Sequence, residues 1–333
     1  MSNVLTGIKP TGMPHLGNYL SVIKPAIERV NGWGVERNEN FFFIADYHAL
    51  TSVKKRIELK DNIRMVAATW LASGLMTNGN DNTNFYVQSD VPEIFQLSWI
   101  LSCYTPKGFL NRAHAYKSAV DKNLEVDKDE DQGIDAGLYN YPVLMAADIL
   151  LFKADQVPVG LDQIQHIEIA RDIAQRFNHR HKKALHLPKA EIIEGVETIL
   201  GLDGRKMSKS YDNTIPLCCS EKKLKKLIKG IPTDSADRNA PKSTEDSLVC
   251  HYFKHFGSPS EVFNFELELK DGMAWGDAKE KLFQLMNTKL APIRDEFDWY
   301  MNNTGRIDQI LEGGRDKVRR IAKNNMEEIL NKM

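Results

Sequence analysis

Two short segments of the chain combine glycine with polar side chains that could handle a nucleotide. The first is Pro14-His15-Leu16-Gly17-Asn18, between a strand-like and a helix-like run. Gly17 lets a ligand approach the backbone, and the helix that follows offers free N–H groups and a positive dipole end. His15 and Asn18 add hydrogen-bonding side chains. Taken alone, the segment also fits a purely structural turn, the commoner role of a Gly/Pro loop before a helix.

The second segment is Gly204–Ser210, with the sequence GRKMSKS. Lys206 and Lys209 are three residues apart, so both ammonium groups could contact one polyphosphate, with Ser208 as a further donor. A solvated basic loop is the alternative interpretation of such a run.

A third group of residues could select a substrate. Tyr141, Met145 and Asp148 are spaced by four and then three residues, so they share one face of a helix that we expect to begin near Tyr141, with Pro142 in its first turn. The indole N–H only donates, so a carboxylate in an apolar pocket is a suitable partner. An unpaired buried carboxylate is costly, so substrates without that donor should be rejected. Pairing of Asp148 with an Arg or Lys elsewhere is the alternative.

These segments need a scaffold, and the first half of the chain predicts one. Apolar runs indicate strands at 4–8, 41–45 and 85–88, and helical periodicity covers 56–73. A further helix should begin near Tyr19. Another should be capped by Asp90, with Pro92 in its first turn. Alternating strands and helices predict an α/β fold with a parallel sheet covered on both faces.

Ligands of such a sheet bind beyond the carboxyl ends of its strands. Three strand-to-helix turns there carry distinctive residues: 9–18, 46–48 and 160–163. Asp162 is expected to cap a helix over 163–177 whose core stripe would be Ile167, Ala170, Ala174 and Phe177.

The second half predicts a different architecture. Beyond about Cys219 the pattern becomes helical, with charged helices and few strand-like runs. Ser220 should cap a helix over 221–229 that has one apolar face and five lysines on the remainder. Before it, 121–135 carries seven acidic residues and is expected to be a mobile surface loop that does not bind calcium.

Composition narrows the class of protein. The 44 basic and 45 acidic residues give a net charge of −1, which argues against a protein coated in positive charge but leaves room for a local nucleic-acid patch. The four cysteines fit neither a disulfide framework nor a metal site, as in a reduced cytosolic protein. No signal peptide is visible, and the apolar run 144–152 is too short to span a bilayer. We expect a soluble, cytoplasmic protein without a membrane partner.

The first two segments, in this order, resemble the signatures of class I aminoacyl-tRNA synthetases, usually written HIGH and KMSKS. The second signature is intact, and the first keeps His15 and Gly17 but has Asn18 in place of the final histidine. The resemblance implies a Rossmann-like parallel-sheet catalytic domain over 1–215. It also implies a smaller, all-helical anticodon-binding domain over 216–333, with the option that the last helix packs back on the catalytic domain.

The stretch 141–148, followed by 157–163, resembles bacterial tryptophanyl-tRNA synthetases. Tyrosyl enzymes generally have a Gln in the helix where this chain has Met145-Ala146-Ala147-Asp148. The resemblance implies activation of L-tryptophan with ATP and Mg²⁺, transfer to tRNA(Trp), and a homodimer. The alternatives are tyrosine specificity, a small-molecule nucleotidyltransferase, and a synthetase paralogue that regulates or binds RNA without catalysis.

The resemblance also assigns roles to single residues. Lys206 and Lys209 would bind the pyrophosphate, and His15 and Asn18 the phosphates nearer the sugar, with no protein cage for Mg²⁺. The implied ATP-binding residues are Lys9, Pro10, Thr11, Gly17, Asn18, Gly160, Leu161, Asp162, Lys206, Met207, Ser208, Lys209 and Ser210. The implied tryptophan-binding residues are Leu5, His48, Tyr141, Met145, Asp148 and Gln163. Lys9, Leu5, Ala115 and Leu161 depart from the best-known members of the family, which affects the expected fine contacts to substrate.

Overall fold

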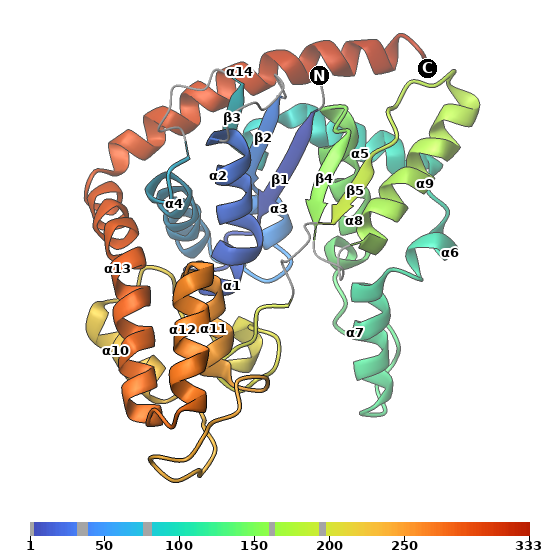
Figure 1. Cartoon of the computed structure of the whole chain (residues 1–333). Coiled ribbons are helices and arrows are strands. Elements are labelled where there is room, and N and C mark those ends of the chain that lie inside the picture. The colour runs from blue at the N-terminus through green and yellow to red at the C-terminus, as the bar shows by residue number, and fades with distance from the viewer. Residues whose placement is uncertain (1–2, 32–38, 76–81, 160–163, 193–197) are drawn as a thin grey trace.

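A parallel sheet forms the centre of the molecule. The computed structural model describes residues 3–31, 39–75, 82–159, 164–192 and 198–333. Over these residues the sheet has five strands in the order β3-β2-β1-β4-β5, and every neighbouring pair is parallel (Figure 1). The strands are β1 (Val4–Ile8), β2 (Asn40–Ile44), β3 (Thr83–Val87), β4 (Gln156–Val159) and β5 (Lys189–Ile192). This is the strand order of a doubly wound sheet, and the order reverses direction between β1 and β4.

Helices cover both faces of this sheet. They are α2 (Lys24–Asn31), α4 (Arg56–Ala72), α5 (Pro92–Tyr104), α8 (Ala136–Leu151) and α9 (Ile164–Arg180). Phe41 and Phe43 of β2 pack into a core with α5, α8 and α9. Phe42 and Ile44, on the opposite face, pack into a core with α2 and α4. Because both faces are covered, all five residues of β2 are buried, which explains the continuous apolar run from Phe41 to Ile44.

Short elements occupy the turns between these helices and strands. They are α1 (Leu16–Asn18), a π-helical segment (Tyr19–Ile23), α3 (Asp46–Ala49), a 3₁₀ turn (Gln88–Asp90), α6 (Lys107–Leu110), α7 (His114–Leu124) and a second 3₁₀ turn (Lys209–Tyr211). The first two run directly into α2, so the helix after β1 changes its hydrogen-bonding pattern twice along its length.

Residues 220–333 form helices only. They are α10 (Glu221–Lys229), α11 (Leu248–Phe256), α12 (Pro259–Lys270), α13 (Trp275–Asn302) and α14 (Thr304–Leu330). The first three and the start of α13 enclose a core of their own, which also receives Leu16, Leu20 and Met207. The helix that follows β1 is thus shared between the sheet and the helical part.

The last helix returns to the sheet, where it lies along the edge strand β3 (Figure 1). A Cβ added to Gly314 would lie 1.8 Å from the carbonyl oxygen of Phe85, so the backbones of α14 and β3 approach very closely. An unpaired strand edge is a site for aggregation, and α14 covers it. The end of α13 also contributes, through Phe297, to the core under α4.

Most predicted elements are confirmed, and three details of the prediction were wrong. The helix after β1 begins at Leu16 rather than near Tyr19. The 3₁₀ turn contains Asp90, and Val91 is the N-cap of α5, although Pro92 does lie in the first turn. Helix α8 begins at Ala136, so Pro142 lies inside it and not in its first turn. Packing of the apolar face of α8 offsets the backbone hydrogen bond that Pro142 removes.

The remaining helix predictions agree with the structure. The core stripe expected on α9 is fully buried. Ser220 accepts a hydrogen bond from the N–H of Lys223 and so caps α10, with Leu224 and Ile228 buried beneath it. The surface loop expected over 121–135 begins later than predicted, because helix α7 extends to Leu124.

Candidate active site

The first signature forms the N-terminus of a helix at the carboxyl end of β1. His15 is the N-cap residue: its Nδ1 accepts a hydrogen bond from the backbone N–H of Asn18 at 3.3 Å. In return, the side-chain oxygen of Asn18 accepts from the N–H of His15 at 3.0 Å. Burial, and secondarily the charge of Lys209, lowers the pKa of His15 to about 4. At neutral pH its single proton therefore sits on Nε2, which is a donor suited to a phosphate oxygen.

The two signatures lie in contact although about two hundred residues separate them in sequence. The N–H of Gly17 points at the sulfur of Met207, with 3.3 Å between the two atoms. The backbone of the first signature also pairs with the segment that follows the second: Leu16 N–H donates to the Ile215 carbonyl at 2.8 Å. A Cβ at residue 17 would lie 3.0 Å from the His15 ring, so the close approach there favours glycine.

Asn213 fixes the shape of the second signature loop. Its side chain is buried and accepts from the N–H of Ser208 at 2.8 Å. Its amide nitrogen donates to Asp203 at 2.7 Å and to the Lys206 carbonyl at 3.0 Å. A Cβ on Gly201 would lie only 2.3 Å from this amide. Sequence reasoning missed Asn213, because a single polar residue after a basic loop gives no signal of which backbone groups it will reach.

The two lysines of the loop have different surroundings. The Lys209 ammonium reaches across to the first loop and donates to the Thr11 carbonyl at 3.0 Å. Partial desolvation lowers the pKa of Lys209. Lys206 is exposed at the stem of the loop, where its backbone pairs with Leu200. Ser208 caps the 3₁₀ turn by accepting from the N–H of Ser210, so these two serines shape the loop.

A cavity of about 480 Å³ lies beside the phosphate-binding candidates. Five of the predicted tryptophan-binding residues line it, together with Lys9: Leu5, His48, Tyr141, Met145 and Asp148. The hydroxyl of Tyr141 lies 2.7 Å from Nε2 of His166, and the Lys9 ammonium lies 5.3 Å from the centre of the Tyr141 ring. Lys9 therefore links the cavity to the first signature loop, and Pro10 is buried beside it.

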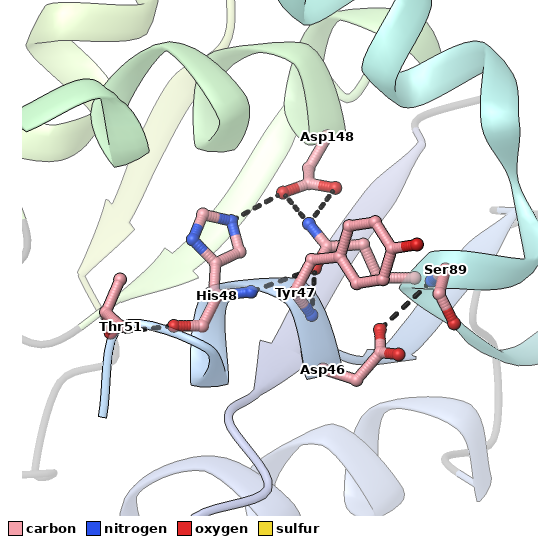
Figure 2. Close-up of polar contacts among 7 residues, drawn as sticks. Asp46, Tyr47, His48, Thr51, Ser89 and Asp148 are labelled. Atoms are coloured by element: carbon pink, nitrogen blue, oxygen red, sulfur yellow. Dashed lines mark hydrogen bonds and ion pairs between the residues drawn. The ribbon is translucent and has the colours of Figure 1, made fainter. Parts of the chain in front are cut away.

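Asp148 is fully buried at one wall of this cavity. Figure 2 shows its carboxylate facing His48, and Nε2 of His48 lies 2.9 Å from Oδ2. The side-chain amide of Gln88 donates to both carboxylate oxygens, at 2.9 Å each. Burial raises the pKa of Asp148 above its ordinary value, and the hydrogen bonds from His48 and Gln88 offset only part of this rise. Within the part of the chain that the structure describes, Asp148 contacts an imidazole and an amide and no Arg or Lys, which does not support the alternative pairing.

Gln88 is the second residue that sequence reasoning missed. It is fully buried and directly follows β3, at the carboxyl edge of the sheet where ligands bind. A polar residue at the end of a buried strand was the available signal.

Some predicted residues cannot be placed. Gly160, Leu161, Asp162 and Gln163 lie outside the described residues, so the expected cap of α9 and the implied contacts to ATP and to tryptophan stay predictions. Ala115 lies in α7, outside the residues that line the 480 Å³ cavity.

The arrangement has two chemically distinct parts. One is an apolar cavity with a buried carboxylate, which can accept a hydrogen bond from a ring N–H. The other is a group of donors, His15 and Asn18 at a helix N-terminus and Lys209 reaching across to Thr11, which can bind and polarise phosphates. Lys9 lies over the Tyr141 ring, at the cavity.

Comparison with known proteins identifies the family. A sequence model described as class I tRNA synthetases (W and Y) matches residues 1–291. The chain belongs to this family. The letters W and Y stand for tryptophan and tyrosine, so this family contains the enzymes for these two amino acids. The fold and the paired signatures described above are those of class I.

Individual relatives agree with this assignment. The chain is 47% identical over 321 residues to a tryptophan–tRNA ligase of Neisseria meningitidis serogroup A, covering 96% of this chain and 94% of that protein. A tryptophan–tRNA ligase of Pseudomonas aeruginosa is 48% identical over 324 residues, 96% of this chain and 71% of that one. The tryptophanyl-tRNA synthetase of Campylobacter jejuni, solved with ADP and tryptophan, superposes with a TM-score of 0.88 at 41% identity, covering 99% of both chains.

Two surface features bear on partners. Among the described residues, no helix is long and apolar enough to cross a membrane. A groove of about 950 Å³ is lined by α3, α5 and the start of α8, and it shares His48 and Tyr141 with the lining of the cavity. Trp99 in this groove is 74% exposed, and Tyr47 packs on Phe95 with 4.5 Å between the ring centres.

Proposed function

We propose that this chain is a tryptophan–tRNA ligase that activates L-tryptophan with ATP and transfers it to tRNA(Trp). The observation that carries the proposal is the buried Asp148 carboxylate, which faces an apolar cavity next to the phosphate-binding signatures. Membership of the tryptophan and tyrosine group, and tryptophan enzymes at 47–48% identity, support the same substrate.

In the first step the tryptophan carboxylate attacks the α-phosphorus of ATP, and pyrophosphate leaves. The substrate supplies the nucleophile, so the protein contributes in-line positioning and stabilises the charge of the departing group. Lys206 and Lys209 would bind the pyrophosphate. The Nε2–H of His15 and the amide of Asn18 would contact the phosphates nearer the sugar.

Substrate selection would rest on the cavity. Its dimensions suit an aromatic amino acid, with Leu5 and Met145 against the ring and Tyr141 near the amino group. An indole N–H would donate to Asp148. Phenylalanine has no ring donor, and binding it would leave the buried carboxylate without its partner, at a cost.

Mg²⁺ would accompany ATP. The groups around the first signature loop are donors and cations, so a bound Mg²⁺ would be held through phosphate oxygens and waters rather than by a cage of carboxylates. The ion would supply charge neutralisation of the phosphates.

The second step needs a tRNA surface. We assign catalysis to residues 1–215 and anticodon binding to the helical residues 216–333, with α14 packed back on the sheet. Helix α10 presents the exposed cations Lys222, Lys223 and Lys226 near the second signature, where phosphates of the tRNA could be neutralised.

A homodimer would cover the groove along α3 and α5, since an exposed tryptophan beside stacked aromatic rings is typical of an interface. Trp99→Lys should convert a dimer to a monomer in light scattering after gel filtration. An unchanged mass would exclude this face. All four cysteines are free, as expected in the reducing cytoplasm, where we place the protein.

The decisive experiment is amino-acid-dependent exchange of labelled pyrophosphate into ATP, with tryptophan, tyrosine and phenylalanine compared. We expect strong exchange with tryptophan alone. Exchange with tyrosine would keep the fold and the reaction but overturn the role of Asp148. Folded protein with Mg²⁺ that exchanges with no amino acid would favour the non-catalytic paralogue.

A further inference from the structure

The buried carboxylate at the wall of the cavity receives two of its hydrogen bonds from one amide. Gln88 donates from Nε2 to Oδ1 and to Oδ2 of Asp148, and the only other donor to this carboxylate among the described residues is His48. Both Gln88 and Asp148 have no exposed surface. A buried carboxylate stays ionised only if hydrogen bonds replace its lost water.

The orientation of this amide is fixed from its other end. Oε1 of Gln88 accepts from the backbone N–H of Tyr47 at 3.2 Å and from that of His48 at 3.3 Å. Both N–H groups belong to the first turn of α3, where helix N–H groups have no partner within the helix. A flipped amide would place its NH₂ group against these two donors. The NH₂ group must therefore point at Asp148.

This geometry also determines which lone pair remains for a ligand. Within the described part of the chain, Oδ2 accepts from both His48 and Gln88, whereas Oδ1 accepts from Gln88 alone. A carboxylate oxygen offers two lone pairs. Oδ1 thus keeps one acceptor position, and the other contacts prevent the carboxylate from rotating away from it.

We propose that Gln88 is a positioning and specificity-determining residue that holds the Asp148 carboxylate ionised and aimed at the ring N–H of the amino acid. This inference rests on the proposed tryptophan–tRNA ligase function. Gln88 touches no substrate in this scheme and acts through Asp148. Its connection to α3 makes the selecting carboxylate dependent on a helix that also borders the exposed aromatic groove.

The test is a competition between two amino acids in the full-length chain. Tryptophan is mixed with its analogue in which a ring sulfur replaces the indole N–H, and the ratio of their kcat/KM values in adenylate formation is measured. Gln88→Met removes the amide with little change of volume. We expect the preference for tryptophan over the sulfur analogue to fall about tenfold, the size of effect when a hydrogen bond to a charged group is lost. The kcat/KM of the analogue should change less than threefold.

A structural role alone would give a different pattern. If Gln88 only supports packing, kcat/KM should fall equally for both amino acids and the ratio should stay at its wild-type value, which would overturn the inference. A ratio measured in one mixture does not depend on how much of the preparation is folded. Gln88→Asn, which is polar but one methylene too short to bridge α3 and Asp148, should lower the ratio in the same way if Gln88→Met does not fold.

The matched control is Asn84, a buried amide on β3, the strand that Gln88 directly follows; it donates to Glu39 and to the Asn40 carbonyl. Asn84→Leu should lower the melting temperature and leave the ratio unchanged. Pyrophosphate exchange by the wild-type chain distinguishes a failure of the proposed function from a failure of the role of Gln88. Absence of any tryptophan-dependent exchange in it would contradict the proposed function itself, whereas normal exchange with an unchanged ratio in Gln88→Met would contradict only the role of Gln88.

Discussion

The amino-acid cavity and the phosphate-binding loop are built in opposite ways. Gln88 and Asp148 are fully buried, and among the described residues three hydrogen bonds of 2.9 Å hold the carboxylate. Around Lys209 the loop is exposed, and it touches the first signature through the Thr11 carbonyl and the Gly17–Met207 contact. A selective pocket gains from a rigid, dehydrated acceptor, whereas a loop that must close on ATP and release pyrophosphate gains from few contacts.

The largest expected effect concerns the amino-acid cavity. Asp148→Ala should lower kcat/KM for tryptophan in pyrophosphate exchange about 1000-fold, because the indole N–H loses its acceptor and two buried donors lose theirs. Asp155, at the opposite edge of the sheet, accepts from the N–H of Asn3 and serves as the control. Asp155→Ala should leave exchange unchanged. A loss of less than tenfold in Asp148→Ala would show that the cavity does not select through this carboxylate.

Substitutions in the phosphate-binding loop should lower kcat rather than the affinity for tryptophan. Lys209→Ala should reduce the rate of adenylate formation about 100-fold or more, the size of effect seen when one donor to a developing charge is removed. The KM for tryptophan should change less than threefold. Lys332→Ala removes an exposed lysine near the C-terminus and should change neither value. Equal losses in rate and in tryptophan affinity would exclude the assigned role.

Asn213 tests whether the loop needs its internal support. Asn213→Ala frees the N–H of Ser208 and the carbonyl of Lys206, so the lysines should lose their position and kcat should fall about tenfold. Asn178 bridges the backbone of Leu185 in a similar way on α9. Asn178→Ala should lower the melting temperature without changing kcat. If the two variants have the same kcat, the support of the loop does not limit catalysis.

The smallest effect is a pH dependence. The pKa of His15 is lowered to about 4, so below pH 6.5 the unfolded chain binds a proton that folded His15 resists. The free energy of unfolding should therefore fall as the pH drops from 6.5 toward 4, and His15→Gln should flatten this dependence. The pKa of His255 is also lowered to about 4, first by burial. His255→Gln should also flatten the pH dependence of the free energy of unfolding, measured by urea titration, but it should leave pyrophosphate exchange unchanged. His15→Gln should lower the exchange.

Local patterns in the sequence predicted much of this molecule. The apolar runs at 4–8, 41–45 and 85–88 correspond to β1, β2 and β3 to within two residues at each end. Burial on both faces makes such runs continuous, so they are visible without a structure. The spacing of Tyr141, Met145 and Asp148 correctly places all three at one cavity, because helical periodicity is a local property.

Helix boundaries were predicted less well. The prediction that α8 begins near Tyr141 relied on the preference of proline for the first helical turn, but the helix begins at Ala136 and encloses Pro142. Local preferences of this kind are a fraction of what tertiary packing contributes, so packing overrides them.

The sequence by itself determined three of the strands, the two signatures and the helix face that carries Asp148, whereas strands β4 and β5 were not predicted. Only the tertiary structure decided the partners of these groups. Gln88 and Asp148 are 60 positions apart, and His48 is 100 positions from Asp148. Periodicity states which side of an element is buried, but it does not state what lies opposite. The residues that lie opposite depend on how the crossover connections bring the ends of β2, β3 and helix α8 to one edge of the sheet. A sequence pattern with a period of two or 3.6 residues does not predict these connections.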